Sequence, residues 1–130
     1  MIKRLYKQWK KRDLIIAVDF DDTLKPFRFQ SEKKCLKIIN LLKKCQQLGA
    51  HIIIFTASDP RRFTMMRSYC ERHKLIISGI NENAIELPFG NDGKIFYNIL
   101  LDDRTGLTQA YYTLLITYWL IKFYKLNIKN

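Results

Sequence analysis

The sequence has few of the residues on which several protein classes depend. It contains three cysteines, two histidines, five glycines and three prolines among 130 residues. Three cysteines without paired or metal-ligand spacing argue against a disulfide framework and a zinc site, and they fit a reducing compartment. Sparse glycine and proline argue against a disordered or fibrous chain. We therefore expect one folded domain over residues 1–130, located in the cytoplasm, or in the host cytoplasm if the chain is viral.

Long apolar runs are also scarce. The uncharged stretch 105–121 includes a glycine, a glutamine and four threonines. A membrane-spanning helix needs roughly 20 mostly apolar residues, so we predict a buried C-terminal helix over 107–125 and no membrane partner. The apolar stretch 14–18 is too short for the core of a signal peptide.

Acidic residues are the minority, with 12 against 23 lysines and arginines, and the formal net charge is +11. Residues 1–74 hold 18 of the basic and 7 of the acidic residues, so this part carries the whole excess. Such an excess predicts a polyanionic partner, although an AT-rich genome would enrich lysine in the same way. The basic segment 1–12 has Leu5, Tyr6 and Trp9 spaced for one face of a short helix or arm.

Apolar runs alternate with helical patterns along the rest of the chain. Four runs are typical of buried strands: 14–19, 51–56, 75–77 and 95–101. Three segments have helical periodicity: 31–49, 59–74 and 107–125. Ser31 and Asp59 are the predicted N-caps of the first two helices. The alternation predicts an α/β fold, a three-layer Rossmann-like parallel sheet with helices on both faces.

Reactive side chains follow three of the four predicted strands. They are Asp19, Asp21, Asp22 and Thr23 after the first, Thr56 and Ser58 after the second, and Asp102 and Asp103 after the fourth, which Lys94 precedes. Ligands of such sheets bind beyond the carboxyl ends of the strands, so we expect these residues to converge. Converging carboxylates repel one another unless a cation binds, and oxygen ligands without His or Cys favour Mg²⁺ over Zn²⁺.

The order of these elements resembles the haloacid dehalogenase-like (HAD) phosphatase superfamily, in particular its small phage and bacterial members. The stretch Asp19-Phe20-Asp21-Asp22-Thr23 is similar to the first motif of the family, and Ile52-Ile53-Ile54-Phe55-Thr56 to the second. Lys94 and the pair Asp102-Asp103 supply the third and fourth motifs. The resemblance covers roughly residues 13–107, and the spacing between the motifs leaves no room for a cap domain.

This resemblance implies a Mg²⁺-dependent phosphomonoester hydrolase with an aspartyl-phosphate intermediate. Asp19 would attack phosphorus, while Asp21 would protonate the leaving oxygen and then deprotonate the attacking water. Thr56 would donate a hydrogen bond to a phosphate oxygen, and Lys94 would neutralise the same group.

The resemblance also implies a metal site and several substrate contacts. Mg²⁺ would be held by the Asp19 carboxylate, the Asp21 main-chain carbonyl and Asp102, with Asp103 in or near the outer shell. Asp22 stands where many relatives have glycine. The candidate substrate contacts are Thr23, Ser58, Arg61, Arg62 and Arg104. Many small relatives have an arginine nearer the second-motif threonine, where this chain has Ser58.

An uncapped site and a basic half predict a phosphorylated nucleic-acid end as the substrate, with nucleotides and sugar phosphates as alternatives. A Mg²⁺-dependent nuclease would use the same acids but would give Thr56 and Lys94 no role. A non-catalytic nucleic-acid-binding protein would leave the aspartate pairs unexplained. A receiver-type phosphoacceptor domain is disfavoured, because its phosphorylated aspartate follows the third strand and precedes its threonine and lysine.

Overall fold

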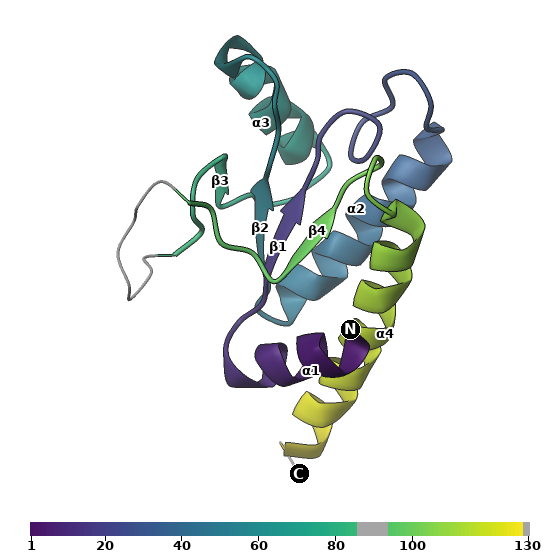
Figure 1. Ribbon diagram of the computed structural model, residues 1–130, viewed down its shortest axis with the longest axis vertical. Coiled ribbons are helices and arrows are strands. Elements are labelled where there is room, and N and C mark those ends of the chain that lie inside the picture. The colour runs from purple at the N-terminus through teal and green to yellow at the C-terminus, as the bar shows by residue number, and fades with distance from the viewer. Residues whose placement is uncertain (86–93, 129–130) are drawn as a thin grey trace.

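Four short parallel strands form the centre of the computed structural model, which describes residues 1–85 and 94–128 (Figure 1). The strands are β1 (Ile15–Val18), β2 (His51–Ile54), β3 (Gly79–Ile80) and β4 (Ile99–Leu101), in the order β3-β2-β1-β4. The helices are α1 (Ile2–Lys11), α2 (Glu32–Gln47), the 3₁₀ helix η1 (Pro60–Arg62), α3 (Phe63–Arg72) and α4 (Leu107–Ile128). The predicted α/β class and parallel sheet are confirmed.

The predicted capping residues begin their helices. The Ser31 hydroxyl accepts a hydrogen bond from the amide of Lys34 at 3.2 Å, at the start of α2. Gly49 follows α2 with a φ of +97°, a conformation that glycine adopts without steric cost. The Asp59 carboxylate accepts the amide of Arg61 at 2.9 Å and caps η1. These local signals explain why α2 and η1 begin where the sequence predicts.

The first and last helices pack against each other at the end of the sheet where the strands begin (Figure 1). Leu5 and Trp9 of α1 are buried, and the Tyr6 ring stands edge-on to Tyr124 with centroids 6.4 Å apart. The basic N-terminal segment is therefore a helix docked on the domain. The predicted C-terminal helix is confirmed and continues to Ile128. None of the described helices has the length and hydrophobicity that a bilayer-spanning segment needs.

The third strand lies later in the sequence than predicted. The prediction of a strand over 75–77 is wrong, because the amide of Leu75 still bonds the Cys70 carbonyl at the end of α3. Ile76 is exposed and contacts the side-chain amide of Gln46. Strand pairing begins only where the Ser78 amide reaches the sheet, and β3 is Gly79–Ile80.

The fourth strand is shorter than the predicted 95–101. Only Ile99–Leu101 pairs with β1. The side chain of Asn98 accepts the Ile15 amide at 2.8 Å, while the Asn98 amide donates to the Ile15 carbonyl at 2.8 Å. The Asn98 side chain thus ends the pairing of β4 with β1, and residues 94–97 before it are not part of the strand.

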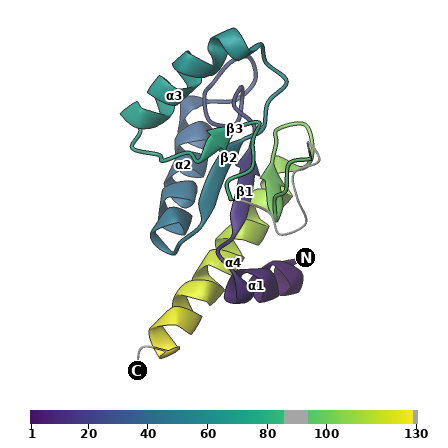
Figure 2. The ribbon, with the colours of Figure 1, turned by 90° about the vertical axis from the view of Figure 1, so that its left-hand side faces the viewer.

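The two faces of the sheet are covered in different ways. Ile16 and Val18 point into the main core, to which all four α-helices contribute buried side chains. Ile15, Ala17 and Ile53 point to the other face, where they pack against Ala84, Ile95, Tyr97 and Leu100. Figure 2 shows α2 and α3 on one side of the sheet and the described segment 94–98, which leads into β4, on the other. In the described residues this second layer is formed by non-helical chain, which differs from the predicted helices on both faces.

The connections after β1 and β2 lead directly to α2 and η1 within the described chain. No cap domain is inserted in either described connection, as predicted. Within residues 1–85 and 94–128, no inserted domain covers the carboxyl ends of the strands.

Candidate active site

The sheet register brings the ends of β1 and β4 together. Val18 pairs with Leu101, and the Asp19 amide donates to the Leu101 carbonyl at 2.9 Å. The chain runs from β1 outward to β2 and β3 and then returns to the other side of β1 to form β4. Such a reversal of strand order opens a crevice at the carboxyl ends of the strands. Asp19 and the pair after β4 lie at this crevice.

Three carboxylates form a cluster at these strand ends. An oxygen of each of Asp19, Asp102 and Asp103 lies within 4.8 Å of the other two. The donor set consists only of carboxylate oxygens, the ligands that Mg²⁺ prefers. The cluster therefore fits a divalent cation, held by the same aspartates that the sequence indicated.

The electrostatics of the cluster also favour a cation. The pKa of Asp19 is raised to about 6, chiefly by burial and in addition by the charges of Asp102 and Asp103, against the opposing hydrogen bond from the Phe20 amide. Burial likewise raises the pKa of Asp103, with a further rise from its hydrogen bond to Asp102. A bound cation would relieve this repulsion and hold the carboxylates ionised.

Asp21 is paired with Arg62 and does not belong to the cluster. Nη1 and Nη2 of Arg62 donate to the two Asp21 carboxylate oxygens at 2.7 and 2.9 Å. Nη1 also donates to the Ser58 hydroxyl at 2.7 Å. These hydrogen bonds to the Asp21 carboxylate raise the pKa of the Arg62 guanidinium. The sequence indicated Arg62 and Ser58 as substrate contacts, and the structure joins them in a chain that orients Asp21.

Thr56, after β2, is fixed by a residue that the sequence reasoning placed only in a loop. The Asn81 side chain accepts the Thr56 amide at 2.8 Å and donates to the Thr56 carbonyl at 2.7 Å. Asn81 has a φ of +54°, a conformation that asparagine tolerates better than most residues. The Thr56 hydroxyl accepts the Ser58 amide at 3.1 Å. The sequence carried one weak signal for Asn81, its place just after a short apolar run.

Two residues of the first motif point into the protein. Asp22 is 4% exposed, and its Oδ1 accepts the four consecutive backbone amides of residues 27–30 at 2.9 to 3.3 Å. Burial acts to raise the pKa of Asp22, but these amides outweigh it and lower the pKa. The φ of +60° at Asp22 explains why glycine suits this position. Thr23 is fully buried, with no partner for its hydroxyl among the described residues, and its predicted substrate contact stays a prediction.

A cavity of about 430 Å³ joins these groups. Its lining combines carboxylates, polar residues, arginines and aromatic rings: Asp19, Asp21, Asp22, Asp102, Asp103, Thr56, Ala57, Ser58, Arg28, Arg104, Phe27, Phe29 and Phe55. The sequence reasoning missed the lining residues Phe27, Arg28 and Phe29. Their signal was the unusual aromatic content of a loop that directly follows the first motif.

Besides Thr23 and Arg62, two further predicted site residues lie outside the lining of this cavity. Lys94 is exposed, and its backbone carbonyl accepts a hydrogen bond from the Asn83 side chain at 3.0 Å. Arg61 is on the surface, where its Nη2 pairs with Asp59 at 2.9 Å. Their predicted contacts with substrate stay predictions. Arg28 and Arg104 are the cations among the lining residues.

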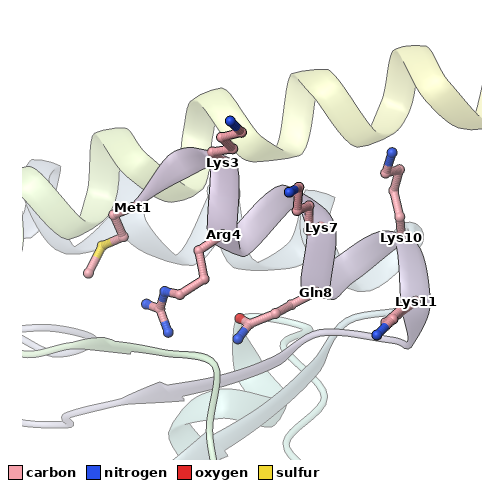
Figure 3. Close-up of a pocket in the computed structure, with 7 residues that line it drawn as sticks. All are labelled: Met1, Lys3, Arg4, Lys7, Gln8, Lys10 and Lys11. Carbon is pink, nitrogen blue, oxygen red and sulfur yellow. The ribbon is translucent and has the colours of Figure 1, made fainter.

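The basic helix α1 lies at the opposite end of the sheet from the carboxylates (Figure 1). Its cationic side chains line a hollow of about 820 Å³ together with Met1 and Gln8 (Figure 3): Lys3, Arg4, Lys7, Lys10 and Lys11. This helix precedes β1, and the reactive side chains follow the strands. The basic side chains of α1 therefore do not surround the candidate site.

The fold is similar to that of a known structure. A conserved protein from Bacteroides thetaiotaomicron superposes with a TM-score of 0.63 at 24% sequence identity, over 85% of this chain and 91% of that chain. No protein-family model matches this sequence, and no curated protein matches it. The likeness shows a shared fold.

Proposed function

We propose that this chain is a Mg²⁺-dependent phosphomonoester hydrolase of the HAD type that acts through an aspartyl-phosphate. The observation that carries the proposal is the position of Asp19. Its backbone is bonded to the end of β4 at 2.9 Å, and its carboxylate lies within 4.8 Å of those of Asp102 and Asp103. The proposed nucleophile therefore shares one crevice with two carboxylates that we propose as metal ligands, and this supports the HAD-type mechanism.

In the first step an Asp19 oxygen attacks phosphorus, the bond from phosphorus to the leaving oxygen breaks, and Asp21 delivers a proton to that oxygen. In the second step a water attacks the aspartyl-phosphate and gives its proton to Asp21. Inorganic phosphate leaves, and both carboxyl groups return to their starting state. Mg²⁺ held by Asp19, Asp102 and Asp103 would screen the anionic phosphate from the anionic nucleophile.

The remaining cavity residues match the needs of a phosphate group. Thr56 has a rigid backbone and a hydroxyl at the cavity, so it is placed to donate to a phosphate oxygen. Arg28 and Arg104 supply positive charge at the lining. The neutralising role proposed for Lys94 requires its exposed side chain to turn toward bound substrate.

The two competing functions make less use of this geometry. A nuclease would use the carboxylate cluster but would give no role to the Asp21–Arg62 pair. A purely binding protein would gain nothing from three mutually repelling carboxylates at the strand ends. The reaction product distinguishes the phosphatase from both alternatives, since only a phosphatase releases inorganic phosphate from a monoester.

A phosphate-release assay tests the proposal. We expect the wild-type protein to release inorganic phosphate from phosphomonoesters with Mg²⁺ and to lose this activity in excess EDTA. Loss of an outer-shell partner typically costs 10- to 100-fold in metal affinity or activity, so removing a ligand with Asp102→Asn should cost at least about 100-fold. Glu71→Gln, on the exposed surface of α3, is the matched control. Equal release with EDTA, or cleavage of phosphodiesters alone, would contradict the proposal.

Arg62 gives a second expected outcome. Arg62→Gln removes both hydrogen bonds to Asp21 and should lower kcat about 10- to 100-fold, because the acid–base group loses its orientation. Arg62→Lys keeps the charge but not the paired geometry, so it should recover only part of the activity. Arg67→Gln, an exposed arginine of α3, should stay near wild type. Steady-state kinetics on one substrate measures all three, and an unchanged kcat for Arg62→Gln would remove Arg62 from the proposed mechanism.

A further inference from the structure

We infer that Phe27 and Phe29 form a stacking platform for a nucleobase attached to the phosphate that Asp19 attacks. The inference rests on the proposed function for the phosphate end and adds the chemical class of the leaving group. It is carried by the exposure of the two rings, by the way their loop is fixed, and by their position on the lining of the carboxylate cavity.

The two rings are exposed to an unusual degree. Phe27 is 59% and Phe29 is 84% exposed. Leaving a phenylalanine in water forgoes most of the free energy that its burial would contribute to folding, so two exposed rings at one cavity indicate a binding surface. The sequence places them two residues apart, on either side of Arg28.

The loop that carries these rings is fixed in place by its backbone. Asp22 accepts the amides of residues 27 to 30 through a single carboxylate oxygen. Asp22 itself belongs to the motif that begins with the nucleophile, only three residues after Asp19. The backbone position of both rings is thus tied to the catalytic strand end before any ligand binds, which reduces the entropy that binding would cost.

The side chains next to the two rings favour a flat aromatic ligand. The Arg28 guanidinium carbon lies 5.2 Å from the centroid of the Phe27 ring, so a cationic plane adjoins the exposed ring. Phe55, 39% exposed, adds a third ring to the lining. Aromatic rings next to arginine are the usual surface on which proteins stack bases, and stacking tolerates any base because each has a π-face.

The cavity has room for such a ligand. Its volume of about 430 Å³ lies in the range of small-molecule sites, and its described lining runs from the carboxylates to the two rings without a covering domain. A phosphomonoester with a base attached through a sugar can reach both ends. A sugar phosphate alone would satisfy the carboxylate end and leave the rings in water.

The first test compares substrates that differ only in the base. We expect the wild-type kcat/KM for adenosine 5′- or 3′-monophosphate to exceed that for ribose 5-phosphate about tenfold or more, from one stacked base. The double substitution Phe27→Ala/Phe29→Ala should remove this preference, by raising the KM for the nucleotide much more than the KM for ribose 5-phosphate. Phe123→Ala, an exposed ring on α4, is the control and should keep the preference.

The second test measures binding without turnover. Asp19→Asn, titrated calorimetrically with adenosine monophosphate, should bind it, and adding Phe27→Ala/Phe29→Ala should weaken binding at least about tenfold. If wild type hydrolyses ribose 5-phosphate as well as the nucleotides, and the ring substitutions change neither rate nor binding, the platform is overturned and the phosphatase stands. If the rings govern nucleotide binding but no monoester is hydrolysed, the phosphatase is overturned and the platform stands.

A third arm identifies the source of the base. A 5′- or 3′-phosphorylated single-stranded oligonucleotide and the matching mononucleotide are compared between low and high salt. A nucleic-acid end as the substrate predicts a higher kcat/KM for the oligonucleotide and a steep fall with salt. A free nucleotide predicts equal or better use of the mononucleotide and a shallow salt response. Either result supports the platform, provided that Phe27→Ala/Phe29→Ala removes the advantage of the preferred substrate.

Discussion

Replacing Asp19 by asparagine is expected to abolish phosphate release, with a fall in kcat of at least about 10⁴-fold. The amide is nearly the same size as the carboxylate, but it cannot form the aspartyl-phosphate and is a poor metal ligand. Release of inorganic phosphate with saturating Mg²⁺ measures the effect. Substantial turnover by this variant would exclude a covalent route through Asp19.

The same variant should be more stable than the wild type in the absence of metal at pH 7.5. The pKa of Asp19 is about 6 in the fold, above its ordinary value of 3.8, because burial and the neighbouring carboxylates disfavour its charge. The stability that the uncharged Asp19 carboxyl preserves is therefore fully present below about pH 4 and is lost as the pH rises through 6 and the carboxyl ionises. Asp19→Asn removes the destabilisation caused by this charge, about 1–2 kcal/mol at neutral pH.

Thermal unfolding at pH 4 and pH 7.5, with and without Mg²⁺, measures this difference. The variant should gain at pH 7.5 and little at pH 4, and Mg²⁺ should stabilise the wild type far more than the variant. If the inactive variant remains folded, its loss of activity is due to the missing nucleophile and not to unfolding. A variant that is less stable than the wild type at both pH values would show that Asp19 supports the fold and would weaken the electrostatic argument.

Replacing Asp22 by alanine is expected to have the largest effect on stability, a loss of about 2–4 kcal/mol. The substitution leaves four backbone amides without their common acceptor and keeps an unfavourable φ of +60° at position 22. Chemical denaturation of the metal-free protein measures the loss. Phosphate release should also fall, because the loop between the first motif and α2 loses its internal support.

Two related substitutions sharpen this result. Asp22→Gly relieves the backbone strain but not the lost hydrogen bonds, so it should be less destabilised than Asp22→Ala. Asp59→Ala removes a carboxylate that caps a short exposed helix, and it should change the denaturation midpoint much less. Similar midpoints for Asp22→Ala and Asp59→Ala would mean that the four amides are satisfied by solvent and that Asp22 does not hold the loop.

The sequence alone was sufficient for the parts of the site that depend on strand order. Apolar runs predicted β1, β2 and β4, and parallel strands place the residues after them at one edge of the sheet. For that reason Asp19, Asp102, Asp103 and Thr56 could be grouped without coordinates.

The contacts between loops could not be predicted in the same way. The bidentate pair of Arg62 with Asp21 joins residues 41 positions apart through side-chain directions that no periodic pattern encodes. The Asp22 hydrogen bonds depend on a positive φ, and the second layer of the sheet depends on non-helical chain. The third strand was misplaced because the apolar run 75–77 is typical of a strand but lies in the turn after α3 with Ile76 exposed, and only long-range pairing decides where the strand begins.

The pairing of β1 with β4 also limits how the protein can be altered. Side chains alternate across a strand, so one residue inserted into Ile99–Leu101 would turn Asp102 to the opposite side of the sheet and bring an aliphatic side chain to the nucleophile. Two inserted residues would restore the orientation but push the carboxylate further along the strand axis. Circular permutants and chimaeras of this domain should therefore keep the residue count between Asn98 and Asp102 unchanged.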